Sequence, residues 1–466
     1  MSAPTIWIIS PLVLSLSLFL IRRQARLVNV IALAYSFLLV WMAWQLPIGE
    51  PMSLGPWSFK INEQLLIYGR QFTIRSVDQP VLVLIYLSTT AWFAGSLLAR
   101  PGYLFIPLGL GIVALLTAAL SIEPFLYAAL LVEMAVLLSV PLLNPPGIPA
   151  RQSVIRLLTF QTLGMPLILI TGWMLTGVET SPSDIELVVR ASVFMAFGFL
   201  LLLGVFPFHS WIPMLMGESH PFTGAFFIST LMSVLSIFGL GFLDRYIWLR
   251  ESAPVYTLLS LAGTMMVVIG GISAALEKHL GRILGFAFLS DIGLALIALS
   301  IESQAGVESF FSLIILRTIN YLVWALALSG FYEQGESLKF DNFRLDAPKY
   351  PFVAGVLIVA IFSVAGFPLL SGFPIRLMLW RELAVNNLLV AVGMLLGFIG
   401  LTISGLRVLS HLVQSYDQEY KIAPDERIVI VIFGLFTFVL ILLGLMPNII
   451  FRIVAPLVEM FPRLIP

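Results

Sequence analysis

The chain contains an apolar run, long enough to cross a bilayer, that meets a proline and then a histidine. The run reaches Phe206, within the stretch Ala191–Thr223, and Pro207, His209 and Glu218 follow it. Proline removes a backbone donor and clashes with the preceding turn, so the helix must kink or break there. Inside lipid, freed backbone groups are tolerated only where protein or water satisfies them. The stretch predicts either a polar path inside a helical bundle or a kinked span whose histidine lies near the headgroups.

Composition assigns the chain to the membrane-protein class. Hydrophobic residues make up 59% of 466 residues and charged residues 11%, whereas soluble domains carry about 25% charged residues. The first apolar run starts at Pro4 and is followed by Arg22, Arg23 and Arg26. This order indicates a retained span, because a signal peptide carries its charge before the run. Counting runs of bilayer length predicts about 14 transmembrane helices, with both termini on the extracytoplasmic side.

Several function classes are excluded by what the sequence lacks. The formal net charge is zero, which gives no reason to expect a nucleic-acid partner, and there are no cysteines. Disulfides, thiolate-bound iron–sulfur clusters and a cysteine nucleophile are therefore excluded. The sequence has no strand–GxGxxG–helix unit and no phosphate loop, so we expect no nucleotide site. We expect no cofactor and no metal, and any redox chemistry that the chain serves must take place in partner subunits.

A second apolar span is interrupted in the same way. The segment IFSVAGFPLLSGFPIRLMLW contains Gly366, Pro368, Gly372 and Pro374. Counted from the fourth span, two successive sets of five spans each have the interruption in their fourth member. Interrupted spans in corresponding positions are typical of repeated transporter halves with a site at the breaks. With five spans in each set, the second repeat would insert upside down. Independent kinks in an ordinary helix bundle are the alternative.

The predicted fold is an all-α polytopic membrane protein with two inverted five-helix repeats, each with one broken helix. Between the second and third spans, two β-prone runs flank Tyr68-Gly69 and predict an extracytoplasmic hairpin. The chain then divides into four parts. These are the first three helices with the hairpin, the two repeats, and the final helix with the C-terminus, at 1–98, 99–245, 253–413 and 428–466.

Charged residues inside the apolar spans are the candidate functional residues, because a charge at the bilayer centre costs about 3 kcal/mol on insertion scales. Glu133 lies near the centre of its span, where burial favours a neutral carboxyl that suits a proton carrier. Arg317 lies half-way along another span, with Asn320 three residues later, and Arg376 follows the second break. Asp291 lies in the repeat counterpart of the span that holds Glu133. For Arg317, a structural pair with a carboxylate and a role in transport both remain open.

Four segments carry a family resemblance. In chain order they are SIEPFLYAALLVEMAVL, FPFHSWIP with GESHPFTGA, RILGFAFLSDIG and SVAGFPLLSGFPIR. They resemble the antiporter-like membrane subunits of respiratory complex I and their relatives in membrane-bound hydrogenases and multisubunit cation/proton antiporters. The resemblance extends from Asp78 to about Arg407. It implies proton translocation coupled to quinone reduction, in an energy-transducing membrane, with the redox reaction performed by partner subunits of a NADH:quinone oxidoreductase-like complex.

The resemblance also implies a central row of charged residues that carries protons. The family has a glutamate on the fifth span, lysines on the seventh and on the eighth or eleventh, and a lysine or glutamate on the twelfth. Glu133 matches the glutamate, and Arg376 stands at the twelfth-span place. The remaining lysine places fall on Leu202, near Val234 and near Leu322. Leucine and valine cannot carry a proton, and arginine barely releases one.

These departures leave three functions open. The chain is a proton-translocating subunit with a rerouted path, a non-conducting scaffold of the membrane arm, or a component of a cation/proton antiporter without redox chemistry. The expected partners are other membrane subunits of a complex I-like or hydrogenase-like assembly and the lipid bilayer. The candidate proton pathway consists of Glu133, His209, Glu218, Asp291, Arg317 and Arg376, with helix breaks at Pro207, Pro368, Gly372 and Pro374.

Overall fold

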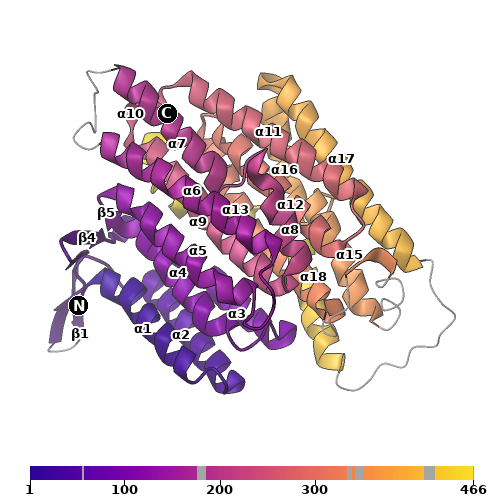
Figure 1. The fold of residues 1–466 in the computed structure, drawn as a ribbon, viewed down its shortest axis with the longest axis horizontal. Helices are drawn as coiled ribbons and strands as arrows, with labels where there is room; N and C mark the ends of the chain where they lie inside the picture. The colour runs from indigo at the N-terminus through magenta and orange to yellow at the C-terminus, as the bar shows by residue number, and fades with distance from the viewer. Residues whose placement is uncertain (55–56, 176–184, 333–337, 342–349, 414–425, 465–466) are drawn as a thin grey trace. The chain divides into compact units, whose positions relative to one another are not determined.

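The computed structural model describes residues 1–54, 57–175, 185–332, 338–341, 350–413 and 426–464. The chain forms two compact units. Figure 1 shows the fold, with the colour following the residue number from indigo to yellow. Unit 1 comprises Met1–Leu203 and Thr230–Arg250, and unit 2 comprises Gly204–Ser229 and Glu251–Pro466. The chain thus passes from unit 1 to unit 2 where the first apolar span is interrupted. It passes back to unit 1 inside a helix, α9 (Pro221–Arg245).

Unit 1 is organised around α4 (Phe105–Ser121). This helix is apolar on all sides and buried along nearly its whole length, as expected of a central helix. By contrast, α2 (Ala25–Gln45) is also largely apolar but leaves Trp41 and Trp44 exposed, which suits a membrane or partner surface. The other helices of the unit are η1 (Thr5–Ile9), α1 (Ser10–Leu20), η2 (Ser76–Asp78), α3 (Gln79–Ala99), η3 (Phe125–Tyr127), α5 (Ala128–Leu143), α6 (Gln152–Met174), α7 (Ile185–Leu202), the last part of α9, and α10 (Ile247–Arg250).

Five short strands also belong to unit 1, counted over its described residues. A hairpin pairs β3 (Gln64–Ile67) with β4 (Arg70–Thr73), and β4 also pairs with β5 (Ile122–Glu123). The turn residues Tyr68 and Gly69 have φ values of 48° and 73°, as a two-residue type I′ turn requires. The hairpin therefore lies where the sequence predicts one, while its side of the membrane stays a prediction. A second antiparallel pair joins β1 (Pro51–Leu54) to β2 (Trp57–Lys60).

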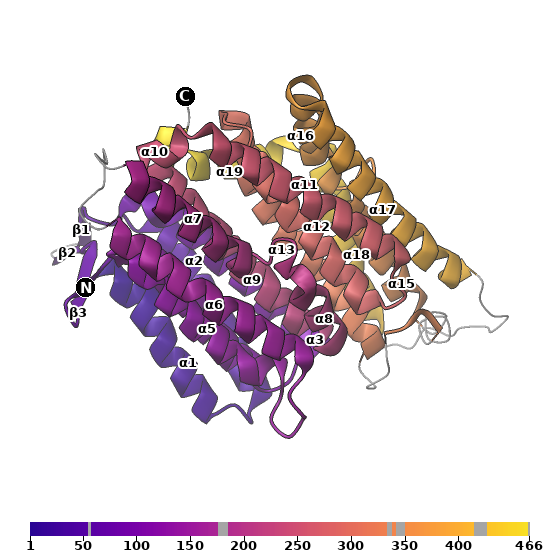
Figure 2. The same ribbon diagram turned by 45° about the horizontal axis from the view of Figure 1, so that its top comes forward.

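Unit 2 has two buried helices at its centre, α12 (Leu280–Leu299) and α13 (Gln304–Tyr332). Glycines bring α11 (Ala253–Leu276) close to α12 and to α17 (Leu388–Val413), and these helices lie side by side in Figures 1 and 2. A Cβ at Gly271 would lie 2.2 Å from the carbonyl oxygen of Gly397. The remaining helices in the described part of unit 2 are η4 (Phe208–Ser210), α8 (Trp211–Glu218), the first part of α9, α15 (Pro351–Ala365), α16 (Gly372–Asn386), α18 (Glu426–Leu445), α19 (Asn448–Val458) and η6 (Pro462–Leu464).

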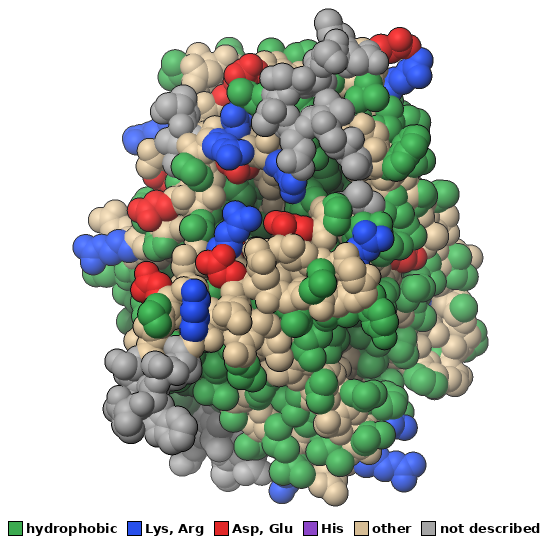
Figure 3. Space-filling model, turned by 90° about the vertical axis from the view of Figure 1, so that its left-hand side faces the viewer, with side chains coloured by type: hydrophobic (Ala, Val, Ile, Leu, Met, Phe, Trp, Pro, Cys, Tyr) green, Lys and Arg blue, Asp and Glu red, His purple; other side chains and the backbone are tan. Residues whose placement is uncertain are grey.

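The chain is an integral membrane protein built mainly of apolar helices. Among the described residues, 8 helices are long and apolar enough to cross a membrane, or 9 if α18 and α19, bent by 77°, form one span. Four shorter apolar helices accompany them. On the face drawn in Figure 3, charged side chains gather in one part and hydrophobic side chains cover much of the rest. The count of about 14 spans and the inverted repeat remain predictions.

Candidate functional site

The first interruption separates α7 from α8. The helix α7 ends at Leu202, and the chain then passes through Gly204, which has a φ of 61°, before η4 and α8 begin. His209 lies in η4, half-buried, with its ring 5.6 Å from that of Phe206. Glu218 is the last residue of α8 and is also half-buried. Both residues therefore stand in unit 2, on the segment that follows the break.

The second interruption separates α15 from α16. Gly366 caps α15 in the left-handed conformation, with a φ of 82°, a common way for a helix to end. Pro368 lies between the two helices, and Pro374 lies in the first turn of α16, where its missing N–H has no helical partner to lose. The break therefore follows from the glycine and proline pattern of the segment.

Glu133 is the charged residue buried in the described part of unit 1. Its side chain on α5 is 8% exposed, and Oε1 accepts a hydrogen bond of 2.6 Å from the hydroxyl of Thr162 on α6. Oε2 is buried and has no hydrogen-bond partner among the residues described. No lysine, arginine or histidine within that part of the chain lies within ion-pair distance of the carboxyl. The partner of Glu133 is therefore a neutral hydroxyl.

Gln161, the neighbour of Thr162, contacts the end of the first half of the broken span. Its amide donates a 2.8 Å hydrogen bond to the carbonyl of Leu202, the last residue of α7. This satisfies one of the carbonyl groups that a helix end leaves unpaired. The Leu202 side chain packs against α6, where a Cβ at Gly164 would lie 2.9 Å from Cδ2 of Leu202. The position that the family resemblance gives to a lysine is thus a tight apolar contact.

In unit 2, Asp291 on α12 and Arg317 on α13 form a buried ion pair. The Nε of Arg317 donates to Oδ2 of Asp291 at 2.5 Å, and the two residues are 1% and 4% exposed. Of the two alternatives for Arg317, the structure shows the pair with a carboxylate. Tyr321, one turn further along α13, stacks on Phe288 with ring centroids 3.8 Å apart and lies within electrostatic range of the pair.

A polar cluster surrounds the second break. The Oδ1 of Asn320 on α13 accepts hydrogen bonds from the hydroxyls of Ser363 (2.7 Å) and Ser371 (3.0 Å), and both serines are fully buried. The guanidinium of Arg376 donates to the carbonyl of Ser363 at 3.2 Å and lies 5.1 Å from the centre of the Phe398 ring. The cluster contains no free carboxylate within ion-pair distance of Arg376 in the described parts of the chain. The sequence predicted Asn320 and Arg376 as polar positions but not the two serines.

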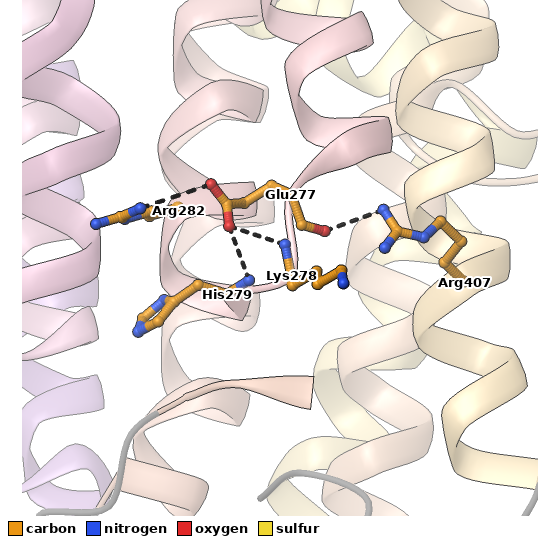
Figure 4. A network of polar contacts seen from close by, with 5 residues as sticks. All are labelled: Glu277, Lys278, His279, Arg282 and Arg407. Carbon is orange, nitrogen blue, oxygen red and sulfur yellow. Dashed lines mark hydrogen bonds and ion pairs between the residues drawn. The ribbon is translucent and has the colours of Figure 1, made fainter. Parts of the chain in front are cut away.

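A second polar network lies at the turn between α11 and α12 (Figure 4). The carboxylate of Glu277 accepts from the backbone N–H groups of Lys278 (2.8 Å) and His279 (3.1 Å) and lies 3.9 Å from Arg282. Arg407 on α17 donates to the carbonyls of Glu277 (3.0 Å) and Ala275 at the end of α11. A cation at this place is favourable because helix C-termini carry partial negative charge.

The imidazole of His279 is the titratable group of this turn. Burial lowers the pKa of His279, the positive charges of Arg282 and Lys339 lower it further, and Glu277 acts in the opposite direction. Lys339 lies opposite His279 in a short antiparallel bridge. In the parts of the chain that the structure describes, no group of three or more His, Asp or Glu side chains is placed to hold a metal ion.

Comparison with known proteins assigns the chain to a family. Residues 174–404 match the family model described as "NADH:quinone oxidoreductase/Mrp antiporter, TM". The chain belongs to this family of antiporter-like membrane subunits. The matched region contains both breaks and all the pathway candidates except Glu133.

Individual relatives agree with this assignment. The chain is 25% identical over 275 residues to NADH-quinone oxidoreductase subunit N of Acidithiobacillus ferrooxidans, a match that covers 56% of this chain and 54% of that protein. The chain spans about half the length of the curated relatives that it matches. In fold, it is similar to a chain of respiratory complex I from Thermus thermophilus (TM-score 0.77, 19% identity, 100% and 99% of the two chains). It is also similar to a chain of the Mrp complex from a Dietzia species (TM-score 0.80, 17% identity, 98% and 97%).

Proposed function

We propose that this family member is a proton-translocating subunit of a complex I-type oxidoreductase, in which partner subunits perform the quinone reduction. The observation that carries the proposal is Glu133. Its carboxyl is buried among apolar helices and held by a neutral hydroxyl, and one of its oxygens, Oε2, has no partner in the described structure. A carboxyl in such a place can take up and release a proton without breaking an ion pair.

The proposal includes the finer features of the fold that the sequence predicts. These are about 14 spans in two inverted five-helix repeats, both termini on the extracytoplasmic side, and neighbouring membrane subunits. The two interrupted helices support the repeat, because each ends close to a glycine with positive φ. The helix α15 ends immediately before Gly366, and α7 ends two residues before Gly204. His209 and Glu218, on the segment after the first break, are the proposed continuation of the proton path.

A scaffold function is the second candidate, and Leu202 favours it. Its side chain is packed into α6, so no titratable group extends from the end of α7 toward Glu133. A rerouted path through Asp291 and Arg317 would have to open a buried ion pair, which is unfavourable once each charge loses its partner. The antiporter alternative is supported by the family model, whose description names the Mrp antiporter, and by the fold similarity to the Mrp chain.

The test is the proton-to-electron ratio of the assembled complex in sealed vesicles. We expect Glu133→Gln to lower this ratio, because the amide side chain of glutamine does not take up or release a proton near neutral pH. Glu123→Gln is the matched control, since Glu123 is half-exposed in an ion pair with Arg75 (3.6 Å). An unchanged ratio in the assembled Glu133→Gln complex would establish the scaffold in place of the pump.

A further inference from the structure

Arg376 spans the second break from one half-helix to the other. It belongs to the second turn of α16, yet its guanidinium donates to the carbonyl of Ser363 at 3.2 Å, in the last turn of α15. The C-terminal end of α15 carries unpaired carbonyl groups and partial negative charge. A fixed cation directed back at this end therefore joins the two half-helices that the glycines and prolines separate.

Two glycines make this position of Arg376 possible. A Cβ at Gly366 would lie 2.7 Å from Cδ of Arg376, and a Cβ at Gly372 would lie 2.6 Å from Nη1 and 2.1 Å from the carbonyl oxygen of Ser363. Cβ atoms do not approach other atoms so closely, so any side chain at either place would displace the arginine or the backbone. Both glycines of the break thus serve the packing of one guanidinium, in addition to the turn itself.

The buried charges of unit 2 do not balance. Asp291, Arg317 and Arg376 are the buried charged side chains in its described part, at 4%, 1% and 5% exposure. One acid faces two arginines, and Asp291 is in contact with Arg317. The Nε of Arg376 is buried without a hydrogen-bond partner in the described structure. A positive charge therefore remains beside the neutral Asn320, Ser363 and Ser371 hydrogen bonds.

We propose that Arg376 is an electrostatic barrier: it closes the second break and excludes protons and other cations from the polar cluster of unit 2. The physical basis is that a fixed arginine charge in a poorly solvated site repels a hydrated proton strongly. Arginine keeps its proton, whereas a buried lysine loses its proton readily. The inference rests on the proposed function in one respect, that proton movement is the task of this subunit.

The consequence is that the polar cluster cannot serve as a hydrogen-bonded route for protons while Arg376 is in place. Asn320, Ser363 and Ser371 are joined by hydrogen bonds of 2.7 to 3.0 Å. Such a chain of hydroxyl and amide groups would otherwise offer a path across α13, α15 and α16. The barrier therefore protects the membrane potential at a place where the broken helix weakens the apolar seal.

The experiment measures passive proton permeability of vesicles that contain the assembled complex in the absence of electron donor. Arg376→Met removes the charge, and we expect a proton leak several-fold above the wild-type leak. Arg376→Lys keeps a cation for folding, and we expect its leak to match wild type at low pH and to increase as pH rises. Arg381→Met and Arg381→Lys are the matched controls, because Arg381 lies on the same helix and is exposed.

A leak in both Arg376 variants that equals the leak of the Arg381 variants at every pH would overturn the barrier. Because no electron transfer is involved, this result does not depend on whether the complex pumps through Glu133. An unchanged proton-to-electron ratio in Glu133→Gln with a raised leak in Arg376→Met would refute the proposed pump and support the barrier. A lowered proton-to-electron ratio in Glu133→Gln with an unchanged leak in Arg376→Met would refute the barrier and support the pump.

Discussion

Among the residues described, unit 1 buries one charged side chain, Glu133, and holds it with the hydroxyl of Thr162, whereas unit 2 buries Asp291, Arg317 and Arg376 in contacts between charged or strongly polar groups. A hydroxyl can donate to a carboxyl in either of its protonation states. The ion pair and the arginine–carbonyl contact of unit 2 are interactions of charged groups. Within one family fold, unit 1 thus holds its buried carboxyl through a neutral hydroxyl, and unit 2 holds its buried charges through an ion pair and a contact with a helix end.

The largest expected effect comes from breaking the ion pair of unit 2. Removing one partner of a buried pair leaves an uncompensated charge and costs about 3 to 5 kcal/mol. We expect Arg317→Leu and Asp291→Leu to lower the thermal stability and yield of the complex strongly, and the double variant to recover part of the loss. Arg190→Leu is the control, because Arg190 pairs with Glu186 on an exposed helix surface, where pairs are worth about 0.5 kcal/mol.

The outcome of this cycle distinguishes a structural pair from a transport element. A double variant that is destabilised by the sum of the two single effects would mean that Arg317 and Asp291 contribute independently. If the single variants assembled normally and only the proton-to-electron ratio fell, unit 2 would contain working transport groups, and the contrast between the two units would be wrong.

Thr162→Val is expected to have a smaller effect, directed at unit 1. It removes the 2.6 Å hydrogen bond to Glu133, which contributes about 1 kcal/mol, and leaves the carboxyl without its described partner. We expect a partial fall of the proton-to-electron ratio toward the Glu133→Gln value, and recovery in Thr162→Ser. Thr171→Val is the matched control, because the hydroxyl of Thr171 on the same helix donates at 2.8 Å to the carbonyl of Leu167 in its own helix and only at 3.5 Å to the carbonyl of Ala191 on α7.

A fall of equal size in Thr171→Val would show that the effect comes from the packing of α6 and not from the contact with Glu133. Failure of Thr162→Ser to recover the ratio would likewise contradict a role for the hydroxyl.

The same pair of threonines shows where sequence reasoning reaches its limit. Apolar runs, interrupting prolines and isolated charges identify spans, breaks and the positions of Glu133 and Arg317, because each is a local property of the sequence. Thr162 and Thr171 look alike in sequence, and a helical threonine ordinarily bonds to its own backbone. Only the packing of α6 against α5 shows that Thr162 differs. The signal that was available is the pair Gln161-Thr162 within an apolar span.

Arg376 illustrates the same limit in unit 2. The sequence identifies an arginine after a break, and the resemblance places it where the family has a titratable residue. Its contact with Ser363 depends on the side-chain direction and on the space left by Gly366 and Gly372. These glycines have an evident local purpose in interrupting the helix, so their second role became visible only with the neighbouring side chains in place.

The smallest expected effect is a dependence of stability on pH that arises from His279, at the edge of unit 2 and outside its buried charges. The folded protein has a lowered His279 pKa, through burial and through Arg282 and Lys339, while the unfolded chain has an ordinary value of about 6.5. Between these two values the unfolded state binds more protons than the folded state. The contribution of the neutral His279 to stability is therefore fully present above about pH 6.5 and decreases as the pH falls toward the folded pKa.

We expect His279→Gln, which stays neutral, to flatten the thermal-stability curve of the complex between about pH 7 and pH 5. Arginine side chains in general do not titrate between about pH 5 and pH 7, so Arg376→Met should leave the slope of the curve unchanged. An equal slope in wild type and His279→Gln would show that the pH dependence arises elsewhere, and a slope that vanished in Arg376→Met would place a titrating group inside the buried polar cluster of unit 2.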